Sequence, residues 1–374
     1  MLSTPRSNHA APHLDQTLMG ISLLCFSLAC GGCRMSPDLL HQPVKPPALE
    51  IGDTIAFVAP AGKVQRSNVM LAKQSLEKMG FVVRASETLF LEHGYLAGLD
   101  EVRAAEFMAA FTDPEIDAIF PCRGGSGTTR ILDALDYDVI RKNPKILIGF
   151  SDITGLQLAI SRRAGLICFH SPFPRGTAGG GSGLSEFSTT WFWRALLKSS
   201  YLDASGNTLP PGWTYDFPEP VARPIPLAAG KARGRLVGGN LSLVAATMGT
   251  PWEIQTRGNI LFLEDVREPP YKIDRLLSTL RLAGKLDHLA GIILGKFILD
   301  PEDRDDPSSF TIETIFEQYF AHLNIPVMRS FPAGHHRHNA TLPIGALIEI
   351  EVTEKSCRVT VLENPVDLRD RTTG

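Results

Sequence analysis

Ser151 stands where a buried strand is expected to turn directly into a helix. Residues 145–150 (KILIGF) are apolar, and helical spacing runs from Ile153 to about Arg163. A serine at such a turn projects its hydroxyl out of the sheet, and the N–H groups that open the helix point into the same space, ready for an oxyanion. The pattern is compatible with a serine nucleophile. The local sequence alone favours a helix N-cap, which serine fills well, because a G-x-S-x-G elbow would need glycine in place of Ile153.

A glycine-rich loop, CRGGSGTTR, follows the preceding predicted strand. Gly124, Gly125 and Gly127 allow a close backbone approach to a ligand, either to cradle phosphate or to present N–H groups to an oxyanion. The loop has neither the P-loop lysine nor a G-x-G-x-x-G pattern, so it supports nucleotide binding only weakly. Arg123 could face a substrate carboxylate or pair with a neighbouring acid. Loops at the carboxyl ends of parallel strands share a crevice, so we expect this loop and Ser151 to face one site.

Two adjacent carboxylates, Glu264 and Asp265, end an apolar strand in ILFLEDVREPPYKIDR. Because successive side chains of a strand point to opposite faces, only one of the two can face a given site. Glu268 is a second candidate for a carboxylate role. The alternative is an acidic turn that pairs with Arg267 or Lys272.

Three histidines, His335, His336 and His338, lie close together in FPAGHHRHNATLPIG. They could be zinc ligands, but the spacing is not the helical H-E-x-x-H pattern, and the loop holds no cysteine or acid to complete a set. We therefore expect no metal. One histidine acting as a general base is the simplest functional interpretation, and three ordinary loop histidines are the alternative.

The elements that must position these residues fall into two groups. From residue 51 to about 163, predicted strands alternate with helices, which indicates an α/β fold with a parallel sheet covered on both faces, Rossmann-like or flavodoxin-like. The second half is richer in strands and predicts a separate α+β domain. We expect an α/β domain that carries the serine over residues 47–171, a Gly- and Pro-rich linker over 172–228, and a C-terminal domain over 229–365.

The amino-acid composition excludes few classes of function, and it is ordinary for a globular enzyme. The 374 residues include 44% hydrophobic and 21% charged residues, and the formal net charge is -3. No basic excess is present to follow a phosphate backbone, so nucleic-acid binding is disfavoured. The cysteines Cys122, Cys168 and Cys357 lack metal-site spacing, and core packing is their expected role.

Residues 1–46 stand apart from this fold. The run LMGISLLCFSLAC is of signal-peptide length and is followed by cysteines, so Cys30 or Cys33 could be the acylated residue of an envelope lipoprotein. The alternative is that translation starts at Met35, which would make the protein cytoplasmic, the location we favour.

Taken in order, the segments of this chain resemble the LD-carboxypeptidase family of serine peptidases, which includes a microcin-immunity branch. The resemblance runs from about Ile51 to about Glu363. The matching segments are GDTIAFVAPAG, CRGGSGTTRILDALDYDVIRKNPKILIGFSDIT, CFHSP, GRLVGGNLSLVAATMGTPWE, ILFLEDVREPPYKIDRLLSTLRLAGKL and PAGHHRHNATLPIG. Ser126 departs from the pattern, since a bulky aromatic residue is expected there in RGGxG.

The resemblance implies a catalytic triad of Ser151, Glu264 and His335, with no cofactor and no metal. It implies that oxyanion donors are the backbone N–H of Asp152 and one from the glycine loop, for which we favour Gly125. The implied reaction removes the terminal D-alanine of a muramoyl tetrapeptide, an L,D bond, in peptidoglycan recycling.

Three other functions remain open on sequence. The substrate could be another peptide conjugate, such as a microcin-type peptidyl-nucleotide. The chain could bind peptidoglycan fragments without cutting them, or it could be a metal-dependent hydrolase built on the histidine loop. The expected partner is a small peptide or muropeptide, and a homodimer is possible.

Overall fold

The computed structural model describes residues 43–176, 181–304 and 306–369, and these belong to one compact unit. The predictions for the N-terminal run and its cysteines lie outside the described residues. Among the described residues, no helix is both long and apolar enough to cross a membrane.

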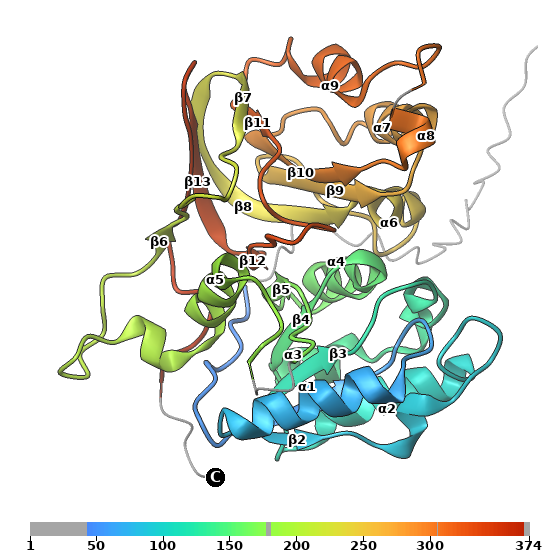
Figure 1. The fold of residues 1–374 in the computed structure, drawn as a ribbon, viewed down its shortest axis with the longest axis vertical. Helices are drawn as coiled ribbons and strands as arrows, with labels where there is room; N and C mark the ends of the chain where they lie inside the picture. Colours follow the sequence, from blue (N-terminus) through green and yellow to red (C-terminus); the bar gives the residue numbers. More distant parts are fainter. Residues whose placement is uncertain (1–42, 177–180, 305, 370–374) are drawn as a thin grey trace, which may run out of the picture. The chain divides into compact units, whose positions relative to one another are not determined.

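The first sheet is built by strands that alternate with helices along the chain (Figure 1). Its order is β12-β5-β4-β3-β1-β2, and β1 to β5 are all parallel neighbours. This 2-1-3-4-5 order is flavodoxin-like, and it confirms the predicted α/β class. The strands are β1 (Thr54–Val58), β2 (Val82–Arg84), β3 (Ala118–Pro121), β4 (Ile146–Gly149), β5 (Cys168–His170) and β12 (Leu342–Ile344).

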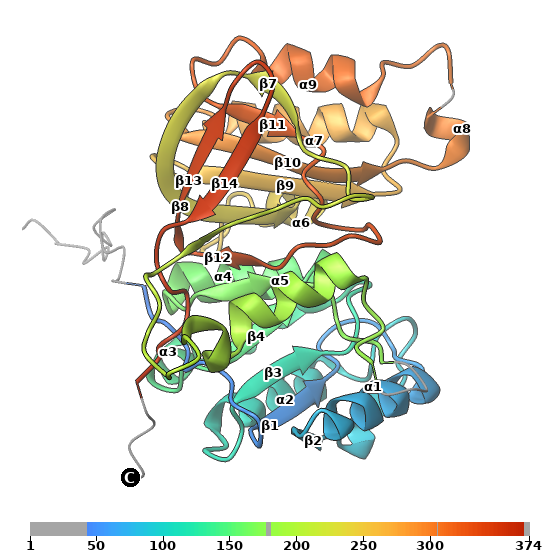
Figure 2. The ribbon, with the colours of Figure 1, turned by 60° about the vertical axis from the view of Figure 1, so that its left-hand side comes forward.

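Apolar side chains on both faces of this sheet hold the helices that cover it. On one face, Phe57, Phe120 and Ile148 pack with residues of α1 and α5, and Figure 2 shows α5 beside β4. On the other face, Val58 and Leu147 pack with residues of α2, α3 and α4. The helices are α1 (Arg66–Lys78), α2 (Asp100–Thr112), α3 (Tyr137–Lys142), α4 (Thr154–Arg163) and α5 (Glu186–Leu196).

The second sheet has eight strands in the order β6-β14-β13-β8-β9-β10-β11-β7. Its central strands β8 to β11 are parallel and its outer strands antiparallel, which fits the predicted strand-rich second half. The strands are β6 (Trp213–Thr214), β7 (Ile225–Ala228), β8 (Gly230–Asn240), β9 (Ile260–Val266), β10 (Gly291–Ile298), β11 (Val327–Arg329), β13 (Leu347–Val352) and β14 (Cys357–Val361). Helices α6 (Leu241–Ala246), α7 (Pro270–Leu282) and α9 (Ile312–Phe320) cover one face, and α8 (Pro301–Arg304) is a single turn.

Two segments depart from the expectations. The apolar spacing of residues 128–135 predicts a helix, but the structure has two short 3-10 turns there. The α-helix starts only after Asp136, whose side chain accepts hydrogen bonds from the N–H groups of Asp138 and Val139. The expected linker contains α5, β6 and β7. The chain also returns from the second half to the first sheet, where β12 pairs with β5. The domain boundaries themselves remain a prediction.

Candidate active site

Ser151 occupies a tight turn directly after β4. Its φ of 62° lies in the left-handed region, which a non-glycine residue enters only at a cost of about 1–3 kcal/mol. The N-cap alternative does not match the structure: α4 begins at Thr154, its cap residue is Ile153, and no side chain caps it. Strain at a serine between a strand and a helix is typical of a nucleophile turn.

The absence of glycine after Ser151 has a local explanation. A Cβ on Gly149 would lie 2.5 Å from Cγ2 of Ile153, so the glycine two residues before the serine makes room for the isoleucine two residues after it. Ile153 is almost fully buried and packs in the core beneath the first sheet. The turn therefore keeps its shape although Ile153 replaces the second glycine of the elbow pattern.

The glycine-rich loop after β3 lies against this turn. An ideal Cβ on Gly124 would lie 3.0 Å from Cβ of Ser151 and 3.2 Å from both Oγ of Ser151 and the backbone nitrogen of Asp152. The loop is held from behind, because the Gly62 N–H donates to the Gly124 carbonyl at 3.0 Å. Gly125, favoured on sequence, lines the same cavity, but the glycine directly against Ser151 is Gly124. Only the three-dimensional course of the loop distinguishes the two.

Asp152 points its side chain away from Ser151 and into the fold. Its carboxylate accepts a hydrogen bond from the Thr128 N–H at 2.8 Å, and the Thr128 hydroxyl donates to the Asp152 carbonyl at 2.6 Å. Burial raises the pKa of the Asp152 carboxyl. Asp152 can therefore contribute only its backbone N–H near Ser151, and its side chain fixes the glycine loop.

Glu264 and His335 meet although they come from distant parts of the chain. Glu264 lies on β9, and His335 lies in the loop between β11 and β12. Oε2 of Glu264 is 2.7 Å from Nδ1 of His335 and accepts the His335 backbone N–H at 3.2 Å. The Glu264 side chain is fully buried, whereas that of His335 is 20% exposed. The contact leaves Nε2 of His335 as the ring nitrogen available to a neighbour.

The Glu264 carboxylate is ionised in spite of its burial. Burial alone would raise its pKa, but interactions with His170 and His335 outweigh that effect and lower the pKa to about 2. Asn240 adds an Nδ2–H donor at 3.3 Å from Oε1. A buried anion beside an imidazole fixes the ring tautomer and stabilises the imidazolium form.

The other two candidate acids, Asp265 and Glu268, form hydrogen bonds or ion pairs away from His335. Asp265 faces away from Glu264 and accepts hydrogen bonds from the Ser242 N–H and hydroxyl at the start of α6. Glu268 pairs with Lys272, and Arg267 lies 3.6 Å from Asp300.

His336 and His338 do not join the Glu264 pair. Nδ1 of His336 accepts the His338 N–H at 3.1 Å, and Nδ1 of His338 lies 3.2 Å from the Ser185 hydroxyl. Burial lowers the pKa of both imidazoles. Within the part of the chain that the structure describes, no group of three histidine, cysteine or acidic side chains is placed to hold a metal ion.

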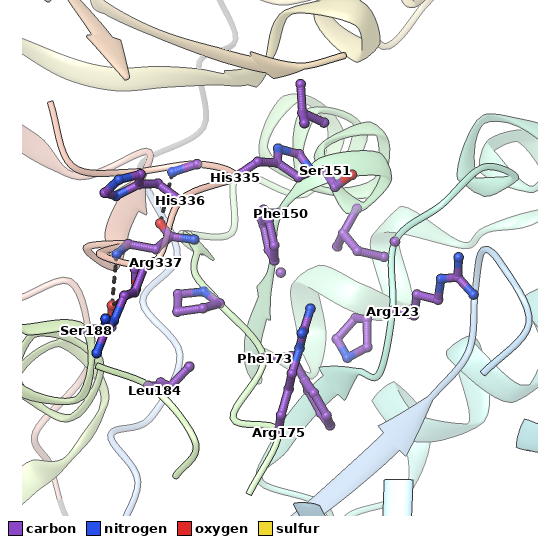
Figure 3. A pocket seen from close by; sticks show the side chains of 18 of the residues that line it. Arg123, Phe150, Ser151, Phe173, Arg175, Leu184, Ser188, His335, His336 and Arg337 are labelled. Atoms are coloured by element: carbon purple, nitrogen blue, oxygen red, sulfur yellow. Dashed lines mark hydrogen bonds between the residues drawn. The ribbon is translucent and has the colours of Figure 1, made fainter. Parts of the chain in front are cut away.

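One cavity of about 840 Å³ joins Ser151, His335 and the glycine loop (Figure 3). Its charged lining is basic, and none of the lining residues described is Asp or Glu. Arg123 is there as expected, although its Nη1 also donates to the Lys63 carbonyl at 2.8 Å, and three further arginines reach the same space, which sequence reasoning did not single out: Arg175, Arg267 and Arg337. The hydrogen bonds of His335 among the described residues go to Glu264, and both Ser151 and His335 line the cavity.

Comparison with known proteins identifies the family to which this chain belongs. Residues 55–171 match the LD-carboxypeptidase N-terminal domain, and residues 233–350 match the LD-carboxypeptidase C-terminal domain. The probable murein peptide carboxypeptidase of Bacillus subtilis is 39% identical over 313 residues, covering 83% of this chain and 93% of that protein. The microcin C7 self-immunity protein of Escherichia coli is 30% identical over 338 residues, covering 85% and 96%.

Solved structures agree with the sequence relatives. The microcin C7 self-immunity protein without ligand superposes with a TM-score of 0.75 at 26% identity, over 87% of this chain and all of that one. The muramoyltetrapeptide carboxypeptidase of Oxalobacter formigenes gives 0.69 at 28% identity, over 84% and 100%. The chain therefore belongs to the LD-carboxypeptidase family, and it is a serine-type hydrolase of that family.

Proposed function

We propose that this protein removes the terminal D-alanine from a muramoyl tetrapeptide, with Ser151 as nucleophile, His335 as general base and Glu264 as the carboxylate that orients it. The observation that carries the proposal is the contact between His335 and Glu264 at the wall of the same cavity into which the strained Ser151 turn opens. Nucleophile, base and orienting acid are the three parts that serine hydrolysis requires.

The chemical steps follow the usual order for a serine hydrolase. Nε2 of His335 takes the hydroxyl proton of Ser151 as Oγ attacks the carbonyl carbon of the scissile L,D amide. The proton then passes to the amine of departing D-alanine, and water hydrolyses the acyl-serine to return the enzyme. The Asp152 N–H and a glycine-loop N–H, for which we retain Gly125, hold the oxyanion. The ideal Cβ position of Gly124, 3.2 Å from both the Ser151 hydroxyl and the Asp152 nitrogen, marks space for that oxygen.

The charge of the cavity supports a carboxypeptidase substrate. A tetrapeptide ending in D-alanine brings a free carboxylate close to the scissile bond, and a carboxylate is recognised well by guanidinium groups. Four arginines line the cavity, and Arg123 is the one we assign to the terminal carboxylate because it directly precedes the Gly124–Gly125 loop. The name of the Bacillus subtilis relative agrees with this class of substrate. Recycling of imported wall fragments places the reaction in the cytoplasm, which we propose as its location.

A second candidate is a peptidyl-nucleotide of the microcin type. It is favoured by the similarity to the microcin C7 self-immunity protein, whose solved structures include complexes with aspartyl sulfamoyl adenosine and with glutamyl sulfamoyl guanosine. The glycine loop has no phosphate-binding lysine pattern, so the nucleotide portion would depend on other contacts.

A substrate panel separates the candidates. Purified protein is incubated with a muramoyl tetrapeptide, the same tetrapeptide with a C-terminal amide, and an aminoacyl sulfamoyl adenosine, and products are quantified by mass spectrometry. The proposal predicts D-alanine release from the free acid and at least tenfold slower cleavage of the amide. Cleavage of the sulfamoyl adenosine alone would contradict it and favour the second candidate.

A further inference from the structure

His170, the last residue of β5, has no part in the mechanism above. Its side chain is fully buried, and among the described residues neither ring nitrogen has a hydrogen-bond partner. Buried polar groups without partners cost free energy and are rare in folded proteins. An imidazole in this state calls for a reason beyond packing.

His170 faces the carboxylate of Glu264, which also holds His335. Nε2 of His170 lies 3.7 Å from Oε1 of Glu264, whereas His335 binds Oε2. The two oxygens of one buried carboxylate therefore each face a different histidine. At 3.7 Å the His170 contact is electrostatic and too long for a hydrogen bond. The low dielectric of a fully buried site strengthens such an interaction.

Oε1 is held less firmly than Oε2. Oε2 contacts the ring of His335 and accepts its backbone N–H. Among the described residues, the partners of Oε1 are the Asn240 Nδ2–H at 3.3 Å and, at a longer distance, His170. Rotation of the carboxylate about its last bond would carry Oε2 away from His335. Electrostatic attraction between the His170 ring and Oε1 opposes that rotation.

Aromatic rings fix His170 relative to the nucleophile turn. The His170 ring packs edge-on against Phe262 at 4.9 Å and against Phe150 at 6.0 Å between centroids. Phe150 directly precedes Ser151, and its ring also lies 4.9 Å from that of His335. Phe150 thus contacts both histidine rings. His170 belongs to the sheet that carries Ser151, and Glu264 belongs to the other sheet (Figure 1).

We propose that His170 is a positioning residue, which holds the Glu264 carboxylate in the orientation that His335 needs and ties it to the sheet of Ser151. The proposal rests on the function proposed above, because it assigns Glu264 its orienting role. His170 does not line the cavity, so it acts without touching substrate. The titratable groups around it are Glu264 and, on the other oxygen, His335; Asp265 faces away onto Ser242.

The test compares three substitutions at His170 by steady-state hydrolysis of the tetrapeptide. Gln places an amide nitrogen near the position of Nε2, Asn places one near Nδ1, and Phe keeps the ring without a donor. We expect His170→Phe and His170→Asn to lower kcat at least tenfold with KM within twofold. His170→Gln should recover most of kcat.

The pH dependence of kcat/KM is a second measurement, which would not change if His170 served only in packing. His170 lowers the pKa of Glu264, so its replacement by Phe should strengthen the attraction of the Glu264 carboxylate for the protonated form of His335. The acidic limb of the kcat/KM profile should therefore move to higher pH in His170→Phe and return in His170→Gln. Ser171→Ala is the matched control. Ser171 follows His170 in the chain, and its buried hydroxyl forms a hydrogen bond with the hydroxyl of Thr341. It should lower the melting temperature without moving the limb.

The results separate the positioning role of His170 from the proposed serine-hydrolase function. Wild-type kcat and an unmoved limb in His170→Phe would overturn the positioning role while leaving the triad intact. If His170→Phe does not fold, equal kcat in the Gln and Asn variants would overturn it instead. Full activity of a Ser151→Ala variant would overturn the proposed function itself.

Discussion

Nδ1 of His335 lies 2.7 Å from Oε2 of Glu264, a contact between residues 71 positions apart in the sequence. The contact joins β9, in the second sheet, to the loop that leads the chain back to the first sheet. It leaves only Nε2 of His335 free for proton transfer, and it pairs that ring with a fully buried anion. The predictions below follow from this relationship and from the glycines around it.

Glu264→Gln should lower kcat by roughly 10³–10⁴-fold, because a neutral amide cannot stabilise the imidazolium and can favour the wrong tautomer. KM should change little, since Glu264 does not line the cavity. Steady-state kinetics on the tetrapeptide measure both constants. A loss confined to KM would show that Glu264 acts on substrate binding instead.

Acid should remove stability that depends on Glu264. Its pKa falls from 4.5 to about 2 on folding, so the ionised form stabilises the folded state above pH 4.5. That contribution, about 3 kcal/mol, is lost as the pH falls from 4.5 towards 2. Urea unfolding at pH 6, 4 and 3 should show a steeper decline for wild type than for Glu264→Gln. Parallel declines would contradict the low pKa.

Gly334→Ala should inactivate the enzyme by displacing Glu264. Gly334 has a φ of 103°, and an added Cβ would lie 2.5 Å from Oε2 of Glu264 and 2.8 Å from its Cβ. Gly52 is a matched control, with a φ of 104° and nothing within 4 Å of the added Cβ. Gly52→Ala carries the same backbone strain and should retain activity, as measured by D-alanine release and thermal unfolding. Similar activity in the two variants would refute the steric argument.

Gly124→Ala should lower kcat by about 10²–10³-fold, as much as the loss of an oxyanion donor would, because the added methyl group blocks the oxyanion position. The added methyl would occupy the space beside the Ser151 hydroxyl and the Asp152 nitrogen. The φ of Gly124 is not in the left-handed region, so the fold should tolerate alanine. Single-turnover kinetics isolate the acylation step. An unchanged acylation rate would show that Gly124 does not lie next to the oxyanion.

Much of the fold could be predicted from hydrophobic periodicity. A run of apolar residues predicts a strand over 260–266, and β9 spans Ile260–Val266. Apolar spacing predicts helices over about 67–79 and 153–163, and α1 (Arg66–Lys78) and α4 (Thr154–Arg163) begin within one residue of these positions. Strand β8 (Gly230–Asn240) was not predicted, because its sequence GKARGRLVGGN is rich in charge and glycine. Neighbouring strands β13 and β9 stabilise it through pairing, which no local pattern records.

The site was predicted in part. The structure brings Glu264 to His335 and places Ser151, Arg123 and Gly125 around the cavity, whereas the roles of these residues remain predictions. His170 and Gly334 could not be found from sequence. Each acts on Glu264 across a gap of many residues, and only the folded chain reveals that proximity.

The most direct test of the central claim is D-alanine release from a muramoyl tetrapeptide by wild type and by Ser151→Ala, with and without EDTA. We predict release by wild type that EDTA does not affect, and a loss of at least 10³-fold in kcat for Ser151→Ala with an unchanged melting temperature. Release by Ser151→Ala at the wild-type rate, or release that EDTA abolishes, would contradict a serine nucleophile at this position.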